Sequence, residues 1–266
     1  MRLVDLAADP MAEIPRPNAA DDVAEGVAGI IDRVRAGGDD ALRKLTQELD
    51  GVGIDSLRVS DDEIDAAAAA VDDAVMNAME ATAENIRTVA EHQRLRPWEA
   101  EVAGGIVGEY INPVNRAGIY VPGGRASYPS TVLMTAMPAR VAGVKEIVMC
   151  VPPGKDGKVA PATLAAAGLC AVDEVYCIGG AQAIAAMAYG TETIKPADVI
   201  VGPGNAYVAE AKKQVAGEVG IESIAGPSEI VIVADSSADP GLVALDLIAQ
   251  AEHGPGGLLA VVCWDA

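Results

Sequence analysis

The chain of 266 residues contains no phenylalanine, and only 3% of its residues are aromatic although 51% are hydrophobic. Its core must therefore be built from aliphatic side chains and methionine, and its length allows one large or two medium α/β domains. No uninterrupted apolar run reaches the roughly 18 residues that a membrane-spanning helix needs. Acidic Asp5 comes too early for a secretory signal peptide, so we expect a cytoplasmic protein that does not contact membranes.

Positive charge is also scarce, because 19 Lys and Arg residues stand against 39 Asp and Glu residues and give a net charge of -20. Binding to nucleic acid or to an anionic membrane requires clustered basic side chains, so neither is expected as a partner. The four cysteines show no C-x-x-C spacing. We interpret them as buried, reduced thiols: Cys150, Cys170, Cys177 and Cys263.

The first 100 residues have a helical pattern. Two helices are predicted before residue 51, separated near Gly38. Ser60 and Glu63 form a capping box ahead of an alanine-rich helix that we expect to continue to about Arg96. His92 has no partner at ligand spacing, so we interpret it as an exposed helix residue and not as a metal ligand.

After residue 97, short aliphatic runs alternate with helical segments, which predicts a doubly wound α/β fold with buried parallel strands. The predicted strands are 117–121, 146–151, 174–178, 198–201 and 230–234, and a further strand is expected over 257–264. The predicted helices start near Ser130, Pro161, Ala181, Asn205 and Pro240.

Three of these strands end in glycine-rich turns, at 122–124, 179–182 and 202–205. Ligands of open α/β sheets bind at the carboxyl ends of strands, where glycine lets the backbone approach an anion. A nucleotide site is the functional interpretation, and a set of tight strand-to-helix turns is the structural one. No turn carries the G-x-G-x-x-G fingerprint.

Gln250 and His253 stand three residues apart on the last predicted helix, away from its apolar face of Leu242, Leu245 and Ile248. Residues at this spacing have Cβ atoms about 5 to 6 Å apart. An amide oxygen and an imidazole nitrogen placed in this way can bind one zinc ion. The alternative is that the helix dipole alone favours a histidine in the last turn.

Several longer motifs occur in a fixed order that resembles the central region of histidinol dehydrogenase. They are GIYVPGG at 118–124, STVLM at 130–134, PARVAG at 138–143, GPGNAYV at 202–208, AGPSE at 225–229 and QAEHGP at 250–255. The resemblance covers essentially the whole chain, densely from residue 116 onward.

This resemblance implies an NAD-dependent and zinc-dependent oxidoreductase that converts L-histidinol to L-histidine through L-histidinal, in histidine biosynthesis. It implies NAD contacts at Tyr120, Gln182 and Asn205. It implies substrate contacts at Ser228, Gln250 and His253, and zinc ligands at Gln250 and His253.

The resemblance also implies a homodimer and a pair of Rossmann-like domains similar to those of aldehyde dehydrogenases. We expect an arm over 1–16, a first α/β domain over 17–119 completed by 229–266, and a second α/β domain over 120–228 on the nucleotide side. The family continues past residue 266 with the Glu-His pair proposed for acid-base catalysis and with further ligands. We therefore expect an amino-terminal portion of the enzyme, with no catalytic residue of its own and negligible turnover alone.

Three alternatives stay open. A related dehydrogenase could oxidise another small polar alcohol such as sulfopropanediol. A non-catalytic nucleotide-binding fragment would bind NAD without binding zinc. A thiol route, suggested by the likeness to aldehyde dehydrogenases, is disfavoured because no cysteine has a neighbouring histidine or lysine and apolar flanks raise a thiol pKa.

Overall fold

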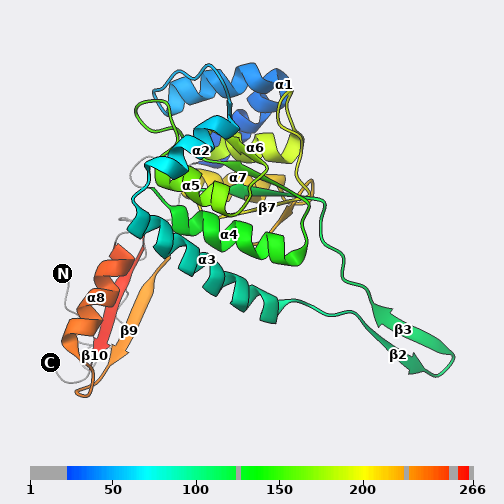
Figure 1. The fold of residues 1–266 in the computed structure, drawn as a ribbon, viewed down its shortest axis with the longest axis vertical. Helices are drawn as coiled ribbons and strands as arrows, with labels where there is room; N and C mark the ends of the chain where they lie inside the picture. Colours follow the sequence, from blue (N-terminus) through cyan, green and yellow to red (C-terminus); the bar gives the residue numbers. More distant parts are fainter. Residues whose placement is uncertain (1–22, 124–126, 225–227, 252–256, 264–266) are drawn as a thin grey trace. The chain divides into compact units, whose positions relative to one another are not determined.

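The computed structural model describes residues 23–123, 127–224, 228–251 and 257–263. These residues fall into two compact units, one over 23–224 and one over 228–263, and each is described by itself (Figure 1). Within the described ranges, no helix is both long enough and apolar enough to cross a bilayer. The domain boundaries that we expected at residues 119 and 228 stay a prediction.

The larger unit is built around a six-stranded sheet in the order β1-β6-β5-β4-β7-β8. Its strands are β1 (Arg58–Val59), β4 (Arg116–Tyr120), β5 (Glu146–Cys150), β6 (Glu174–Tyr176), β7 (Val199–Val201) and β8 (Gly220–Ile221). All neighbours are parallel except β1, which pairs with β6 in the antiparallel sense. The four aliphatic runs predicted in this unit are thus confirmed as strands, whereas the two-residue strands β1 and β8 were too short to show a pattern.

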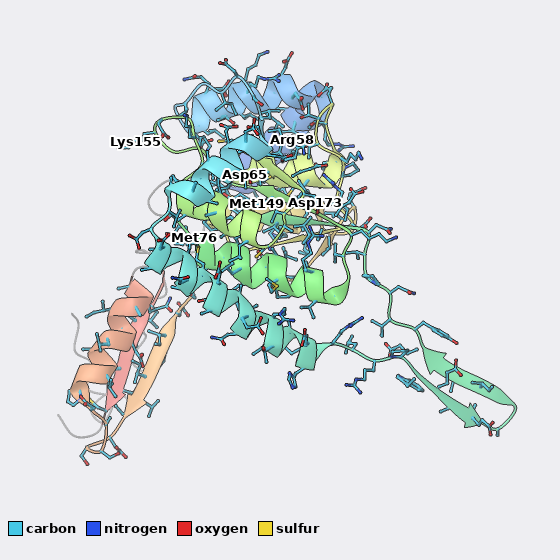
Figure 2. All side chains as sticks on the ribbon, viewed as in Figure 1. Arg58, Asp65, Met76, Met149, Lys155 and Asp173 are labelled. Carbon is cyan, nitrogen blue, oxygen red and sulfur yellow. The ribbon has the colours of Figure 1, made fainter. Side chains whose placement is uncertain are left out.

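Helices cover both faces of the sheet. Alternate residues of each strand therefore point into two separate cores, one on each face. The covering helices begin within one residue of the predicted starts: α4 (Pro129–Ala142), α5 (Pro161–Leu169), α6 (Gly180–Tyr189) and α7 (Ala206–Val215). Ile119 and Met149, the latter labelled in Figure 2, belong to the core under α4 and α5. Tyr120 and Cys150 belong to the core under α6 and α7. The predicted α/β class with a parallel sheet is confirmed.

The amino-terminal helices form an outer layer on this unit. Helix α1 (Ala24–Leu49) packs on α6 and α7, α2 (Asp61–Ala70) on α5, and α3 (Asp73–Gln93) on α4 (Figure 1). The break predicted near Gly38 is present as a kink, where that glycine has φ 50° and ψ -135°.

The long helix predicted from Ser60 to Arg96 is wrong. The capping box at Ser60 and Glu63 is confirmed, but α2 ends at Ala70 and a second helix follows. Asp72 starts that helix, because its carboxylate accepts a hydrogen bond of 2.8 Å from the amide of Ala74. A run of alanine favours helix throughout, so the break depends on the capping aspartate and not on helix propensity.

A β-hairpin that the sequence pattern did not predict follows α3. Strands β2 (Trp98–Val102) and β3 (Gly105–Glu109) pair only with each other, and every residue of both strands is exposed. The indole of Trp98 donates to Glu109 at 2.9 Å across the pair. The alternation of charged and apolar residues in the hairpin therefore does not mark a half-buried strand.

The smaller unit contains β9 (Ile230–Ala234), α8 (Pro240–Ala251) and β10 (Leu259–Cys263). The strands pair in parallel and α8 packs against them, so the two strands predicted here are confirmed. Their predicted burial is wrong, because Val231 and Val233 are 54% and 66% exposed and Cys263 is exposed as well. By the register of the pair, Val231 and Val233 point to one face of the two-stranded sheet and Cys263 points to the other, so exposed side chains occur on both faces.

Candidate functional site

The predicted cofactor residues of the larger unit gather at the carboxyl edge of its sheet. Tyr120 is the last residue of β4, Gln182 lies in the first turn of α6 after β6, and Asn205 directly precedes α7 after β7. Strand β4 lies beside β7, and the helices that follow these two strands cover opposite faces of the sheet. This is the place where ligands bind to open α/β sheets.

Tyr120 is buried, and its hydroxyl accepts a hydrogen bond of 3.1 Å from the backbone N–H of Gly180. Gly180 begins α6 with φ 63°, a conformation that favours glycine. Burial raises the pKa of Tyr120 to about 12. The phenol therefore keeps its proton at neutral pH, and it can act as a hydrogen-bond donor but not as a base.

Gln182 is 1% exposed, and its Oε1 has no hydrogen-bond partner among the described residues. Its Nε2 lies 3.5 Å from Oδ2 of Asp50, whose pKa is raised by burial. An unpaired buried polar atom costs about 1 to 3 kcal/mol, and native structures contain few of them. The amide oxygen is thus an acceptor suited to a donor on a ligand.

Asn205 is the N-cap of α7, since its Oδ1 accepts hydrogen bonds from the amides of Tyr207 at 3.0 Å and Val208 at 3.1 Å. The structural role that such a residue commonly has is therefore present. Because capping uses the oxygen, Nδ2 is the atom that Asn205 offers to a ligand.

The loop between β7 and α7 requires glycine. Gly202 has φ 120°, and a Cβ atom there would lie 2.1 Å from the carbonyl oxygen of Tyr120. A Cβ atom at Gly204 would lie 2.3 Å from the side chain of Val208. The backbone of this loop is thus packed directly against the end of β4, next to the other candidate residues.

Sequence reasoning missed two residues at this edge. Lys212 on α7 is 1% exposed and forms a 2.6 Å ion pair with Glu222, which follows β8. The available signal was a lysine at a position where helical spacing places it with apolar Val208 and Val215.

The structure brings Ser228 and Gln250 together in the smaller unit. Nε2 of Gln250, near the end of α8, donates to Oγ of Ser228 at 2.7 Å and to its carbonyl oxygen at 3.1 Å. This orientation makes Oε1 the atom of Gln250 that can accept a donor or bind a metal. His253 lies outside the described residues.

No cluster of three or more His, Cys, Asp or Glu side chains suited to a metal occurs within the described ranges. Gln250 is the only predicted zinc ligand among the described residues. The zinc site therefore stays a prediction that depends on His253.

The thiols of the larger unit are poor nucleophiles, because burial raises the pKa of each one. The pKa reaches about 11 at Cys170 and about 12 at Cys177, and that of Cys150 is raised further. A thiolate is needed for covalent attack on an aldehyde. Buried Cys150, Cys170 and Cys177 therefore do not support the thiol route.

Comparison with known proteins identifies one family. The family model described as histidinol dehydrogenase matches residues 15–266. Histidinol dehydrogenase of Methanothermobacter thermautotrophicus is 52% identical over 236 residues, which are 88% of this chain and 55% of the relative. That of Gluconobacter oxydans is 52% identical over 247 residues, with 92% of this chain and 57% of the relative covered.

A crystal structure of histidinol dehydrogenase from Elizabethkingia anophelis has the same fold, with a TM-score of 0.88 and 39% sequence identity. The match covers 96% of this chain and 58% of that one. The chain thus spans between 54% and 61% of the length of the curated relatives that it matches.

Proposed function

We propose that this chain, which belongs to the histidinol dehydrogenase family, binds NAD at the carboxyl edge of its parallel sheet. NAD bound there would serve the oxidation of L-histidinol to L-histidine through L-histidinal. The observation that carries the NAD site is the buried, unpaired Oε1 of Gln182 beside the glycine loops. The reaction would belong to histidine biosynthesis.

The order of the parallel strands supports a nucleotide site. Numbered along the chain, the five parallel strands of the larger unit lie in the order third, second, first, fourth, fifth. Dinucleotide-binding Rossmann folds have this order, with the ligand at the point where the order reverses. We therefore propose a Rossmann-like fold of the aldehyde dehydrogenase kind for this chain.

The residues present fit NAD in their chemistry. The Tyr120 phenol and the Asn205 amide nitrogen offer donors, and Gln182 offers an acceptor. Glycines at 202 and 204 let the backbone approach a large ligand. The amino termini of α6 and α7 favour a pyrophosphate. NAD, when bound, would accept hydride from the substrate carbon.

Ser228, Gln250 and His253 would hold the substrate, and the last two would also hold zinc. Zinc, when bound, would orient the amino and imidazole groups of the substrate. The described contact fits this role, because the hydroxyl and carbonyl of Ser228 fix the Gln250 amide with its oxygen as the ligand atom.

We also propose a cytoplasmic homodimer as the working form, and we assign no catalytic acid or base to this chain. Tyr120 and the buried thiols keep their protons at neutral pH. Without a general base, alcohol oxidation loses about 100- to 10,000-fold in rate. The chain alone is therefore expected to bind NAD with negligible turnover. No contact among the described residues favours the oxidation of another small polar alcohol. None favours a purely nucleotide-binding role.

Calorimetric titration of NAD into the unaltered chain and into Gln182→Leu tests the proposal. Leucine has a similar volume and removes both the unpaired oxygen and the 3.5 Å contact of Nε2 with Asp50, so the stability of the free protein should change little. NAD should nevertheless bind about tenfold more weakly, because its donor loses the acceptor.

Gln214→Leu is the matched control, because Gln214 lies on α7 and its amide donates to Ala24 and Glu210. Its NAD affinity should equal that of the unaltered chain. Equal affinity in Gln182→Leu as well, or no saturable binding by the unaltered chain, would overturn the NAD site.

A further inference from the structure

An ion pair between buried Lys212 and partly exposed Glu222 lies directly beside the loop that joins β7 to α7. Nζ of Lys212 is 2.6 Å from Oε1 of Glu222 and 3.1 Å from the carbonyl oxygen of Gly202. The lysine is 1% exposed among apolar residues of α7. A buried ammonium group is costly unless it is paired and hydrogen-bonded, so apolar packing does not explain a lysine at this position.

The ion pair holds both main-chain polar groups of Gly202. The same Oε1 of Glu222 that pairs with Lys212 accepts a hydrogen bond of 2.8 Å from the N–H of Gly202. Gly202 follows β7 and Glu222 follows β8, which is the neighbouring strand. The pair therefore joins the carboxyl ends of two adjacent strands through one residue of the loop.

The other end of the loop is fixed by Asn205, which caps the helix that carries Lys212. At the first end of the loop, the backbone of Gly202 packs so closely on Tyr120 that no Cβ atom fits. A displacement of Gly202 would thus press on Tyr120, and the short chain connection from residue 202 to 205 would pass it on to Asn205. The polar contacts that prevent it are those of Lys212 and Glu222.

We infer that Lys212 and Glu222 are positioning residues for NAD, which hold Gly202 so that Tyr120 and Asn205 keep the spacing that the cofactor requires. This inference rests on the proposed function. The pair acts through the loop backbone and is assigned no contact with NAD or with the substrate.

The test compares Lys212→Met and Glu222→Gln with Lys213→Met, which removes a neighbouring lysine whose side chain is 60% exposed. Circular dichroism first shows that each variant is folded in buffer without urea. Calorimetry in the same buffer then gives the dissociation constant for NAD. Hydrogen exchange of the peptide over 200–206 reports how firmly the loop is held. Hydrogen bonds to charged groups are worth enough to change affinity about tenfold or more.

Both variants of the pair should bind NAD about tenfold more weakly and exchange faster over 200–206, while Lys213→Met should match the unaltered chain. Glu222→Gln keeps an oxygen for the Gly202 N–H and is a partly exposed position, so it serves if Lys212→Met does not fold. A purely structural pair would lower the urea midpoint and leave the dissociation constant of the folded protein unchanged.

Unchanged NAD affinity or unchanged exchange over 200–206 in folded Lys212→Met and Glu222→Gln would therefore overturn the inference. Failure of the unaltered chain to bind NAD is a different result. It would contradict the proposed function and remove the cofactor role of the pair with it.

Discussion

The two units of the chain differ in what covers their strands. In the larger unit, β4 is buried along its whole length and helices cover both faces of the sheet. In the smaller unit, α8 packs against β9 and β10, but apolar side chains are exposed on both faces of the strands, Val231 and Val233 on one and Leu259 and Val261 on the other. The apolar stripe of α8 itself, formed by Leu242, Leu245 and Ile248, is at least 60% exposed. A closed core thus supports the predicted NAD residues, whereas Ser228 and Gln250, the described members of the predicted substrate site, lie on an open layer.

Polar groups differ in the same way. In the larger unit, buried Arg116 joins the starts of three neighbouring strands by pairing with Glu146 and Glu174. In the smaller unit, the contact between Ser228 and Gln250 is exposed. Substitutions at the closed core of the larger unit should therefore cost most. The first three predictions below measure that cost within the larger unit, and the last compares the two units.

The largest effect is expected for Gly202→Ala. Its Cβ atom would lie 2.1 Å from the carbonyl oxygen of Tyr120 at a backbone φ of 120°. Strain and overpacking each cost about 1 to 3 kcal/mol, so we expect a loss of about 4 kcal/mol in the free energy of unfolding. Urea denaturation measures it. Gly217→Ala has φ 103° but open space around its Cβ, and it should lose only the strain.

Arg116→Met should lower the free energy of unfolding by about 3 kcal/mol, because it leaves the carboxylates of Glu146 and Glu174 without their cation. Removing one partner of a buried ion pair costs about 3 to 5 kcal/mol. The lower value applies here because the Glu146 side chain is 50% exposed. The matched control is Arg87→Met on α3, where the whole ion pair is exposed and the expected loss is much smaller because water screens the charges. Equal losses would contradict the contrast between buried and exposed charges.

Acid should reduce the difference between the unaltered chain and Arg116→Met. Burial raises the pKa of Glu174, but the hydrogen bonds and charge of Arg116 outweigh it and lower this pKa below the ordinary 4.5. A lowered pKa stabilises the fold above about pH 4.5, and this stability is lost as the pH falls through the folded-state value. Urea midpoints of both proteins between pH 7 and about 3 should converge at the acid end. A difference in urea midpoint between the two proteins that does not change with pH would contradict the ion pair of Arg116 with Glu174.

The smallest effect is expected for Leu245→Gln on α8, where the leucine is 60% exposed. Surface substitutions usually change the free energy of unfolding by less than about 0.5 kcal/mol. The counterpart Leu133→Gln on α4, which is 1% exposed, should cost at least about 3 kcal/mol because it buries an unpaired amide. A loss above about 1 kcal/mol for Leu245→Gln would show that the stripe is covered in solution, and it would remove the contrast between the units.

Much of the larger unit could be predicted, because its main strands are aliphatic runs, three of which end in glycine turns, and because α4, α5 and α7 start at proline or after asparagine. The parallel α/β class and the positions of Tyr120 and Asn205 at strand ends follow from this pattern. The hairpin and the break at Asp72 could not, since an exposed hairpin has no burial pattern and a single cap overrides helix propensity.

Burial in the smaller unit could not be predicted from its strands either, because an aliphatic run is the same whether one face or both faces are covered. The pair of Lys212 and Glu222 was missed because ten residues separate them in the chain and only the sheet brings them together. The roles of Gln182 and Ser228 came from the family resemblance. Gln250 and His253 were already candidate zinc ligands by their spacing, but His253 lies outside the described residues.

The protonated phenol of Tyr120 bears on the conditions in which such an enzyme could operate. Oxidation of an alcohol by NAD releases a proton, so alkaline solution favours the product by mass action. A donor that ionises only at about pH 12 would hold the dinucleotide equally well at pH 7 and at pH 10. At the proposed NAD site, the contribution of this donor to cofactor binding would then stay level across that alkaline range.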